Sequence, residues 1–123
     1  MAREPLPKYK NSDNRRSRNP AAVRVNMTDA SKRMDFNANA RDLLGEDVHF
    51  VVIDIDREER KVWVMASGEC ERAYSLRHTA ANFYIGCGHL ASVMGIQHSF
   101  KAEVTHESDG SLLFIIPKEA MAE

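Results

Sequence analysis

Apolar and polar residues alternate in short runs along this chain, with turn residues between the runs. Val23, Val25 and Met27 alternate with polar neighbours within 21–28. Because successive side chains of a strand point to opposite faces, this pattern predicts a half-buried strand. A second short strand is expected at 34–36.

The spacing of the apolar residues then changes from every second residue, as in a strand, to the spacing typical of a helix. Ala40, Leu43 and Leu44 lie on one face of a helix predicted over 38–44. Asn37 precedes it as a helix cap, because its side chain can accept hydrogen bonds from the free amides of the first turn. Gly45 follows, where a left-handed residue commonly ends a helix.

A β-hairpin is predicted after this helix. The segment 48–54 is apolar on both of its sides, which is typical of a strand in the middle of a sheet with both faces covered. A turn at 56–59 and a returning strand at 61–66 complete the hairpin.

The helix and hairpin then occur a second time. Shifting 43–66 by 50 positions places it on 93–116 without a gap, so that Gly45 meets Gly95 and Phe50 meets Phe100. This predicts a second helix at 89–94, with strands at 72–76, 83–85, 99–106 and 111–117. Self-similarity at a fixed spacing indicates a fold built by duplication.

We therefore expect an α+β, mostly β fold in which a pseudo-two-fold axis relates two β-α-β-β repeats. The repeats, about 21–67 and 71–117, form one duplicated domain over 21–117, after a basic flexible arm at 1–20 and before a frayed tail at 118–123. A single unit of about 45 residues is too small to bury a stable core alone, which favours one shared core.

The first repeat resembles the AbrB/SpoVT-type transition-state regulators and the antitoxins built on the same unit. The resemblance is carried by 23–26, Asp29, 32–37 and 40–45, followed by the hairpin. It implies a swapped-hairpin β-barrel, usually assembled from two chains and here supplied by one, with basic residues of the first strand and turn facing DNA. The chain departs from the family pattern at Asn37, where a proline is usual, and at Lys32, which replaces a glycine.

Charge is distributed unevenly along the chain. Residues 1–33 carry nine Lys/Arg against three Asp/Glu, a net +6, whereas 34–123 carry a net −7 from eight against fifteen. A basic arm on an acidic body indicates an anionic partner for the arm. There is no apolar run of membrane-spanning length and no secretory signal, so a cytosolic location is expected.

The resemblance implies that four basic residues of the first repeat contact DNA: Arg24, Lys32, Arg33 and Arg41. Arginine and lysine bind phosphate, and Arg33 can also reach a base edge. Arg15, Arg16 and Arg18 of the arm can follow the phosphate backbone or a minor groove. The alternative for all of them is a solvated charged surface.

The acidic hairpin allows two further interpretations. Glu59 and Lys61, with Asp54 or Asp56, fit part of a nuclease metal site, which needs two carboxylates on one divalent cation. Acidic residues beside a hairpin turn are more often solvated. The same hairpin can instead bind a basic protein partner through Asp54, Asp56, Glu58 and Glu59.

The two cysteines, Cys70 and Cys87, are expected to be reduced thiols in a cytosolic protein. Cys87 lies two residues from His89, and His98 follows, and Cys and His side chains are the usual ligands of zinc. The spacing matches no strong zinc pattern, and a Cys-His nucleophilic pair rests on composition alone.

The sequence therefore predicts a small DNA-binding regulator that is not an enzyme and needs no cofactor or metal. It is expected as a monomer with internal pseudo-symmetry or as a homodimer. The alternative is a phage or mobile-element protein-interaction or inhibitor module, whose acidic body binds a protein partner rather than DNA.

Overall fold

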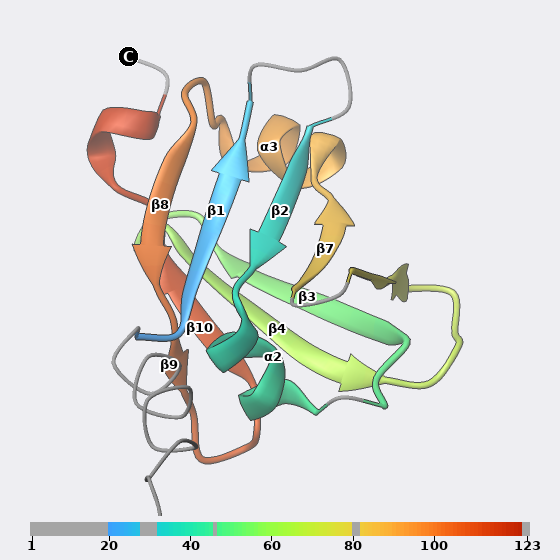
Figure 1. Cartoon of the computed structure of the whole chain (residues 1–123). Helices are drawn as coiled ribbons and strands as arrows, with labels where there is room; N and C mark the ends of the chain where they lie inside the picture. Colours follow the sequence, from blue (N-terminus) through green and yellow to red (C-terminus); the bar gives the residue numbers. More distant parts are fainter. Residues whose placement is uncertain (1–19, 28–31, 46, 80–81, 122–123) are drawn as a thin grey trace, which may run out of the picture.

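The computed structural model describes residues 20–27, 32–45, 47–79 and 82–121. In these residues it contains ten strands in two antiparallel sheets, two α-helices and a short 3-10 helix (Figure 1). The expected α+β, mostly β class is confirmed. Of the expected arm at 1–20, residues 1–19 lie outside the described part of the chain.

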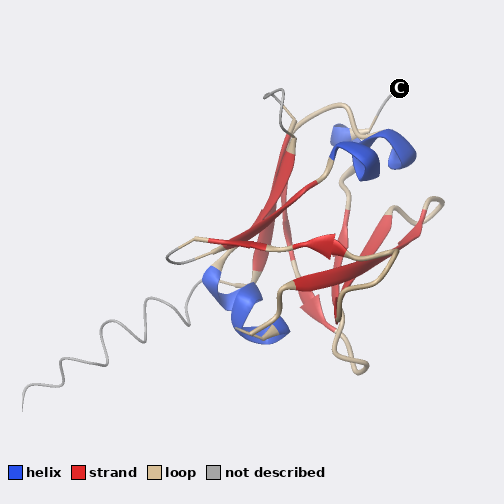
Figure 2. Ribbon diagram, turned by 90° about the vertical axis from the view of Figure 1, so that its right-hand side faces the viewer, coloured by secondary structure: helices blue, strands red, loops and turns tan. Residues whose placement is uncertain are grey.

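The two five-stranded sheets enclose the core between them, with the α-helices at opposite ends (Figure 2). The first sheet has the order β6-β7-β2-β1-β8, with bounds Arg77–His78, Phe83–Gly86, Arg33–Phe36, Ala22–Asn26 and Phe100–Glu103. The second has the order β5-β3-β4-β10-β9, with bounds Tyr74–Ser75, Phe50–Asp56, Lys61–Ser67, Leu112–Ile115 and Thr105–His106.

The edges of the two sheets are joined by bent strands. Only Leu76 separates β5 of the second sheet from β6 of the first, and only Val104 separates β8 from β9. Both residues are buried, at 7% and 8% exposure. The expected strands at 72–76 and 99–106 are therefore each divided, because the chain changes sheets at an apolar residue that enters the core.

The helices follow the sequence pattern closely. Helix α2 spans Ala38–Leu44, and the Asn37 side chain accepts from the Ala40 amide at 3.0 Å, as predicted. Helix α3 spans Gly88–Met94 and ends at Gly95 in the left-handed region, with φ 78°. Neither helix of the described residues is long and apolar enough to cross a membrane.

Aromatic rings at the centre of the core join the two repeats. Phe36 of β2 stacks on Phe83 of β7, with ring centroids 4.7 Å apart and planes 17° from parallel. Phe114 of β10 meets Phe36 edge-on at 6.5 Å, which connects the two sheets. All three side chains are essentially inaccessible to solvent, so the core is shared between the repeats.

The 50-residue shift holds for some elements and fails for others. It relates α2 to α3, and it relates buried Val62 to buried Leu112. In β7 and β8, however, the residues that point into the core are related to those of β2 and β3 by a shift of 49. Phe100 therefore corresponds to Val51, and Phe50 lies outside the core. A one-residue slip reverses the face of every side chain in a strand, so the gap-free alignment of Phe50 with Phe100 is wrong.

Two further segments differ from expectation. The outward side of β3 is not covered, since Val52 is half-buried there and Asp54 is exposed. The tail expected to fray instead forms the 3-10 helix η1 at Lys118–Ala120. The Ala120 carbonyl accepts from the amides of Gln97 at 2.7 Å and His98 at 3.1 Å, and its side chain is buried. These contacts hold the end of the chain beside α3.

Asn37 should contribute more to stability than an ordinary helix cap. Its carboxamide oxygen also accepts from the Ala22 amide at 3.1 Å, and its nitrogen donates to the Pro20 carbonyl at 2.8 Å. We expect Asn37→Ala to lower the free energy of unfolding by about 1–2 kcal/mol, because it leaves both amides without their acceptor. Urea denaturation measures this loss, and Asn37→Asp, which keeps the acceptor, should recover most of it. Equal losses in the two variants would contradict this role.

Candidate nucleic-acid interface

One row of side chains crosses the whole outer face of the first sheet. The strand registers pair Arg77 with Tyr84, Tyr84 with Asp35, Asp35 with Arg24, and Arg24 with Lys101. Cross-strand partners share a face of a sheet, so these five side chains lie on one side. At about 4.8 Å between strands, the row is roughly 19 Å wide.

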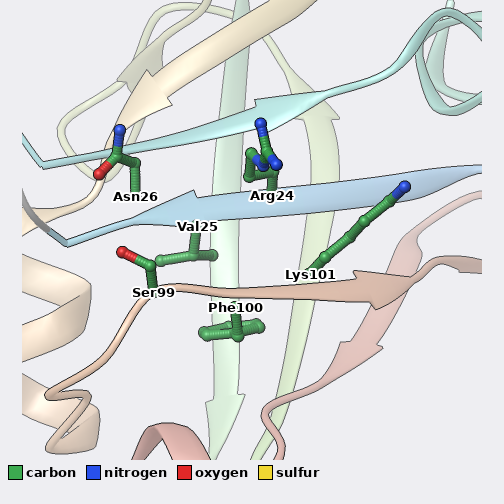
Figure 3. Close-up of a pocket in the computed structure, with 6 residues that line it drawn as sticks. All are labelled: Arg24, Val25, Asn26, Ser99, Phe100 and Lys101. Carbon is green, nitrogen blue, oxygen red and sulfur yellow. The ribbon is translucent and has the colours of Figure 1, made fainter.

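This outer face is predominantly basic. Five exposed cations line it or its end: Arg24, Lys32, Arg33, Arg77 and Lys101. The acidic residues on its strands are Asp35, which is partly buried, and Glu103 at the far edge. Figure 3 shows Arg24 and Lys101 together on β1 and β8, while Phe100 points to the other side. The face is therefore suited to binding a polyanion.

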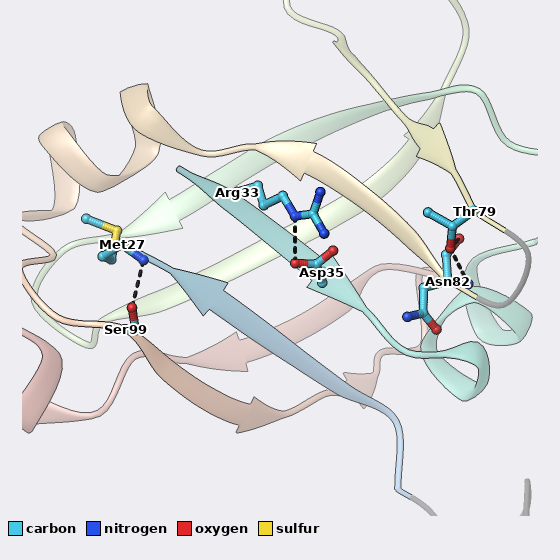
Figure 4. Close-up of polar contacts among 6 residues, drawn as sticks. All are labelled: Met27, Arg33, Asp35, Thr79, Asn82 and Ser99. Atoms are coloured by element: carbon cyan, nitrogen blue, oxygen red, sulfur yellow. Dashed lines mark hydrogen bonds and ion pairs between the residues drawn. The ribbon is translucent and has the colours of Figure 1, made fainter. Parts of the chain in front are cut away.

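Arg33 is held more firmly than the other cations. Its guanidinium carbon lies 4.3 Å from the centroid of the Tyr84 ring, and its Nε donates to an Asp35 carboxylate oxygen at 3.0 Å (Figure 4). The opposite strand position is Gly86, which has no side chain to cover it. The terminal nitrogens of Arg33 have no partner among the described residues. They can make the two parallel hydrogen bonds that arginine forms with phosphate or guanine.

The backbone around this face is fixed by polar contacts at the strand ends. The Ser99 hydroxyl accepts from the Met27 amide at 2.7 Å, joining the chain after β1 to the chain before β8 (Figure 4). Thr79 and Asn82 bond to each other at the opposite end of the sheet, where the Asn82 amide donates to the Thr79 hydroxyl at 3.0 Å. The spacing of the cations is thus set by paired strands whose ends are also tied.

The structure brings together three of the predicted DNA-binding residues, Arg24, Lys32 and Arg33. Arg41 does not join them, because it lies on α2, where its side chain is only 14% exposed and its Nε is 3.9 Å from an Asp42 oxygen. The predicted arm residues, Arg15, Arg16 and Arg18, lie outside the described residues.

Arg77 and Lys101 complete the row, and the sequence did not place either of them in the site. Lys101 could have been found from alternation, because it lies between two apolar positions of its strand. Its neighbour across the sheet is Arg24, 77 positions earlier. No local pattern reveals such a pairing, since the register depends on contacts between the two repeats.

The acidic hairpin is occupied largely by its own contacts. Asp54 binds Arg72 at 2.8 Å, and the Asp56 carboxylate accepts from the Glu59 amide at 3.0 Å in the turn. Glu58 and Glu59 are exposed at the tip. No group of three or more possible metal-binding His, Cys, Asp or Glu side chains occurs in the described part of the chain.

The two cysteines lie in different surroundings. Cys70 is exposed beside Ser67, whereas Cys87 is buried between β7 and α3. Burial raises the pKa of the Cys87 thiol to about 11, although the positive charge of Lys32 opposes this shift. The Cys87 thiolate, which is the form that attacks or binds metal, is therefore disfavoured at neutral pH.

Comparisons of this chain with protein-family models, curated proteins and solved structures found no match. The AbrB-like resemblance therefore stays an expectation drawn from residues 23–66.

We expect one reactive thiol in the native protein. Cys70 should react with a disulfide reagent at pH 8, and Cys87 should react only after unfolding, because its pKa is about 11. Thiol titration with and without guanidinium chloride measures this, and Cys70→Ser should abolish the native reaction. Two rapidly reacting thiols in the native protein would contradict the burial of Cys87.

The raised pKa of Cys87 also predicts that the free energy of unfolding falls as the pH rises from 9.0 towards 11, because the thiol ionises first in the unfolded chain.

Proposed function

We propose that this protein is a small DNA-binding regulator of the AbrB-like type, which contacts duplex DNA through the outer face of its first sheet. The observation that carries the proposal is the row from Arg77 to Lys101. A row roughly 19 Å wide is broader than the DNA major groove, which is about 12 Å wide. Its two ends can thus contact phosphates on both sides of a groove.

Within this proposal the cations have different roles. Arg24, Arg77, Lys101 and Lys32 bind phosphate, which fixes the position of the protein on DNA without reading its sequence. Arg33 contacts a base edge, because Tyr84 and Asp35 hold its guanidinium and leave its terminal nitrogens exposed. Arg15, Arg16 and Arg18 add affinity that does not depend on sequence.

We further propose that the two repeats form a swapped-hairpin barrel within one chain. The support is the pairing between repeats: β1 pairs with β8, β3 with β5, β2 with β7 and β4 with β10. A shift of 49 residues relates Val25 to Tyr74 and Val51 to Phe100. Val25 pairs with Phe100, and Tyr74 pairs with Val51, so these two strand pairs are equivalent in the two repeats. A single chain of this kind does not require a palindromic site, whereas a homodimer would favour one.

The acidic-module alternative has weaker support from the side-chain contacts. It needs Asp54, Asp56, Glu58 and Glu59 to face a basic partner. Two of these carboxylates already bind groups of the chain itself, Asp54 the guanidinium of Arg72 and Asp56 an amide of its turn.

The proposal predicts a salt dependence that specific variants reduce. Each phosphate contact contributes about 0.9 to the slope of log affinity against log salt, so Arg24→Ala with Lys101→Ala should lower the slope by about 2. Fluorescence anisotropy of a labelled 30-base-pair duplex across a potassium chloride series measures it. Arg57→Ala with Arg72→Ala removes the same charge elsewhere and should change the slope less. Equal changes in both double variants would contradict the assigned face.

Arg33 should affect selectivity as well as affinity. We expect Arg33→Ala to weaken binding to a site selected from a random duplex pool by about 1–3 kcal/mol, with a smaller effect on unselected duplex. The selection and both affinities are measurable with the same anisotropy assay. Unchanged binding to the selected duplex would remove Arg33 from the interface.

A further inference from the structure

An open hollow of about 500 Å³ lies at one end of the basic face, beside the bend at Leu76 that joins the two sheets. Its walls come from β2, from β7 and from the bent strand β5–β6. Six of its lining residues carry the argument: Lys32, Arg33, Tyr74, Arg77, Tyr84 and Gly86. Its volume is within the range of small-molecule sites, about 300–1,000 Å³.

The hollow combines aromatic rings with positive charge. Tyr84 belongs to the first sheet and Tyr74 to the second, so the bend at Leu76 brings two phenol rings to one place. Lys32, Arg33 and Arg77 add three exposed cations, and none of the described residues that line the hollow carries a carboxylate. A ligand that matches this lining has a flat aromatic group and a negative charge.

The geometry provides a separate place for each part of such a ligand. The Arg33 guanidinium already lies over the Tyr84 ring at 4.3 Å, and an aromatic base can stack on this layered pair, which we call the Arg33–Tyr84 wall. Gly86 stands opposite Arg33, and a Cβ built there would meet nothing within 4 Å, so the space in front of this wall is open. Lys32 and Arg77 lie on either side of β7 and can bind phosphate.

We propose that this hollow binds a nucleotide, with its base against the Arg33–Tyr84 wall and its phosphate at Lys32 and Arg77. The nucleotide can be a free mononucleotide or an unpaired nucleotide of a single strand, and both present the same chemistry. The site overlaps the proposed duplex interface at Lys32, Arg33 and Arg77, whereas Arg24 and Lys101 belong to the duplex interface alone. It does not depend on duplex binding.

The first test locates and classifies the ligand. The full-length protein is titrated with adenosine 5′-monophosphate, and separately with inorganic phosphate, while backbone amide signals are followed by NMR. Saturable shifts at Tyr84, Gly86 and Arg77 with the nucleotide, and at least about 10-fold weaker binding of phosphate, support the site. No saturable shift, or equal affinity for phosphate alone, overturns it.

The second test uses two glycines as a matched pair. Gly86→Val puts a side chain into the hollow, whereas Gly68→Val adds the same group at another exposed position, and neither glycine has a positive φ or a neighbouring atom within 4 Å of the added Cβ. We expect only Gly86→Val to weaken nucleotide binding, by about 10-fold or more. Tyr84→Leu should cost about 10-fold through lost stacking, and Tyr84→Phe should retain binding. Equal affinity of the two glycine variants overturns the proposal.

A third comparison distinguishes a free mononucleotide from a single strand as the ligand. It also distinguishes nucleotide binding in the hollow from duplex binding. An oligomer of eight deoxyadenylates that binds at least 100-fold more tightly than the mononucleotide identifies a single strand as the ligand, and similar affinities identify a free nucleotide. Arg24→Ala with Lys101→Ala should weaken duplex binding and leave mononucleotide binding unchanged. If the unmodified protein binds the mononucleotide but no duplex, the proposed DNA-binding function is wrong and the nucleotide site stands. If it binds duplex but no mononucleotide, the nucleotide site is wrong and the proposed function stands.

Discussion

The pairing of β2 with β7 is the constraint on which the rest of the structure depends. It joins the first repeat to the second, and its register determines what lies on each side. On the inner side it stacks Phe36 on Phe83 in the core. On the outer side it places Asp35 beside Tyr84, with Arg33 above the ring. A slip of one residue would exchange the two sides, so the core and the candidate site depend on the same hydrogen bonds.

The two sheets also separate the charges of the chain. Residues 34–123 carry a net −7, which argues against nucleic-acid binding if the body is considered as a whole. Yet the outer face of the first sheet presents a row of cations, while Asp54, Asp56, Glu58 and Glu59 lie on or beside the β3–β4 hairpin of the second. Local potential, rather than net charge, determines where a polyanion binds. An acidic protein can therefore present a basic binding face.

Local features were predictable where neighbours in sequence supply the interactions. Helix α2 and its Asn37 cap follow from the period of apolar residues and from short-range hydrogen bonds, whereas Gly45, expected in the left-handed helical region, has φ 122° and ψ 135°. Arg24 is an outward residue of its strand, as the alternation predicts, whereas Arg33 belongs to a strand that begins one residue earlier than predicted. The equivalence of Phe50 and Phe100 failed, because the segment between α3 and the first inward residue of β8 is one residue shorter than the corresponding segment between α2 and Val51 of β3. Similar residues at equal spacing can thus face opposite sides.

The sequence by itself determined the class of fold and the two helices, and it singled out Arg24, Lys32 and Arg33, which are three of the five cations on the basic face. Alternation and capping act over a few residues, so they are visible in the chain order. Only the tertiary structure decided that Lys101 lies beside Arg24, that Arg77 lies beside Tyr84, and that Arg41 is largely covered. Those relations depend on strand registers between segments that are far apart in the chain. Such registers are set by the shared core and not by any local pattern.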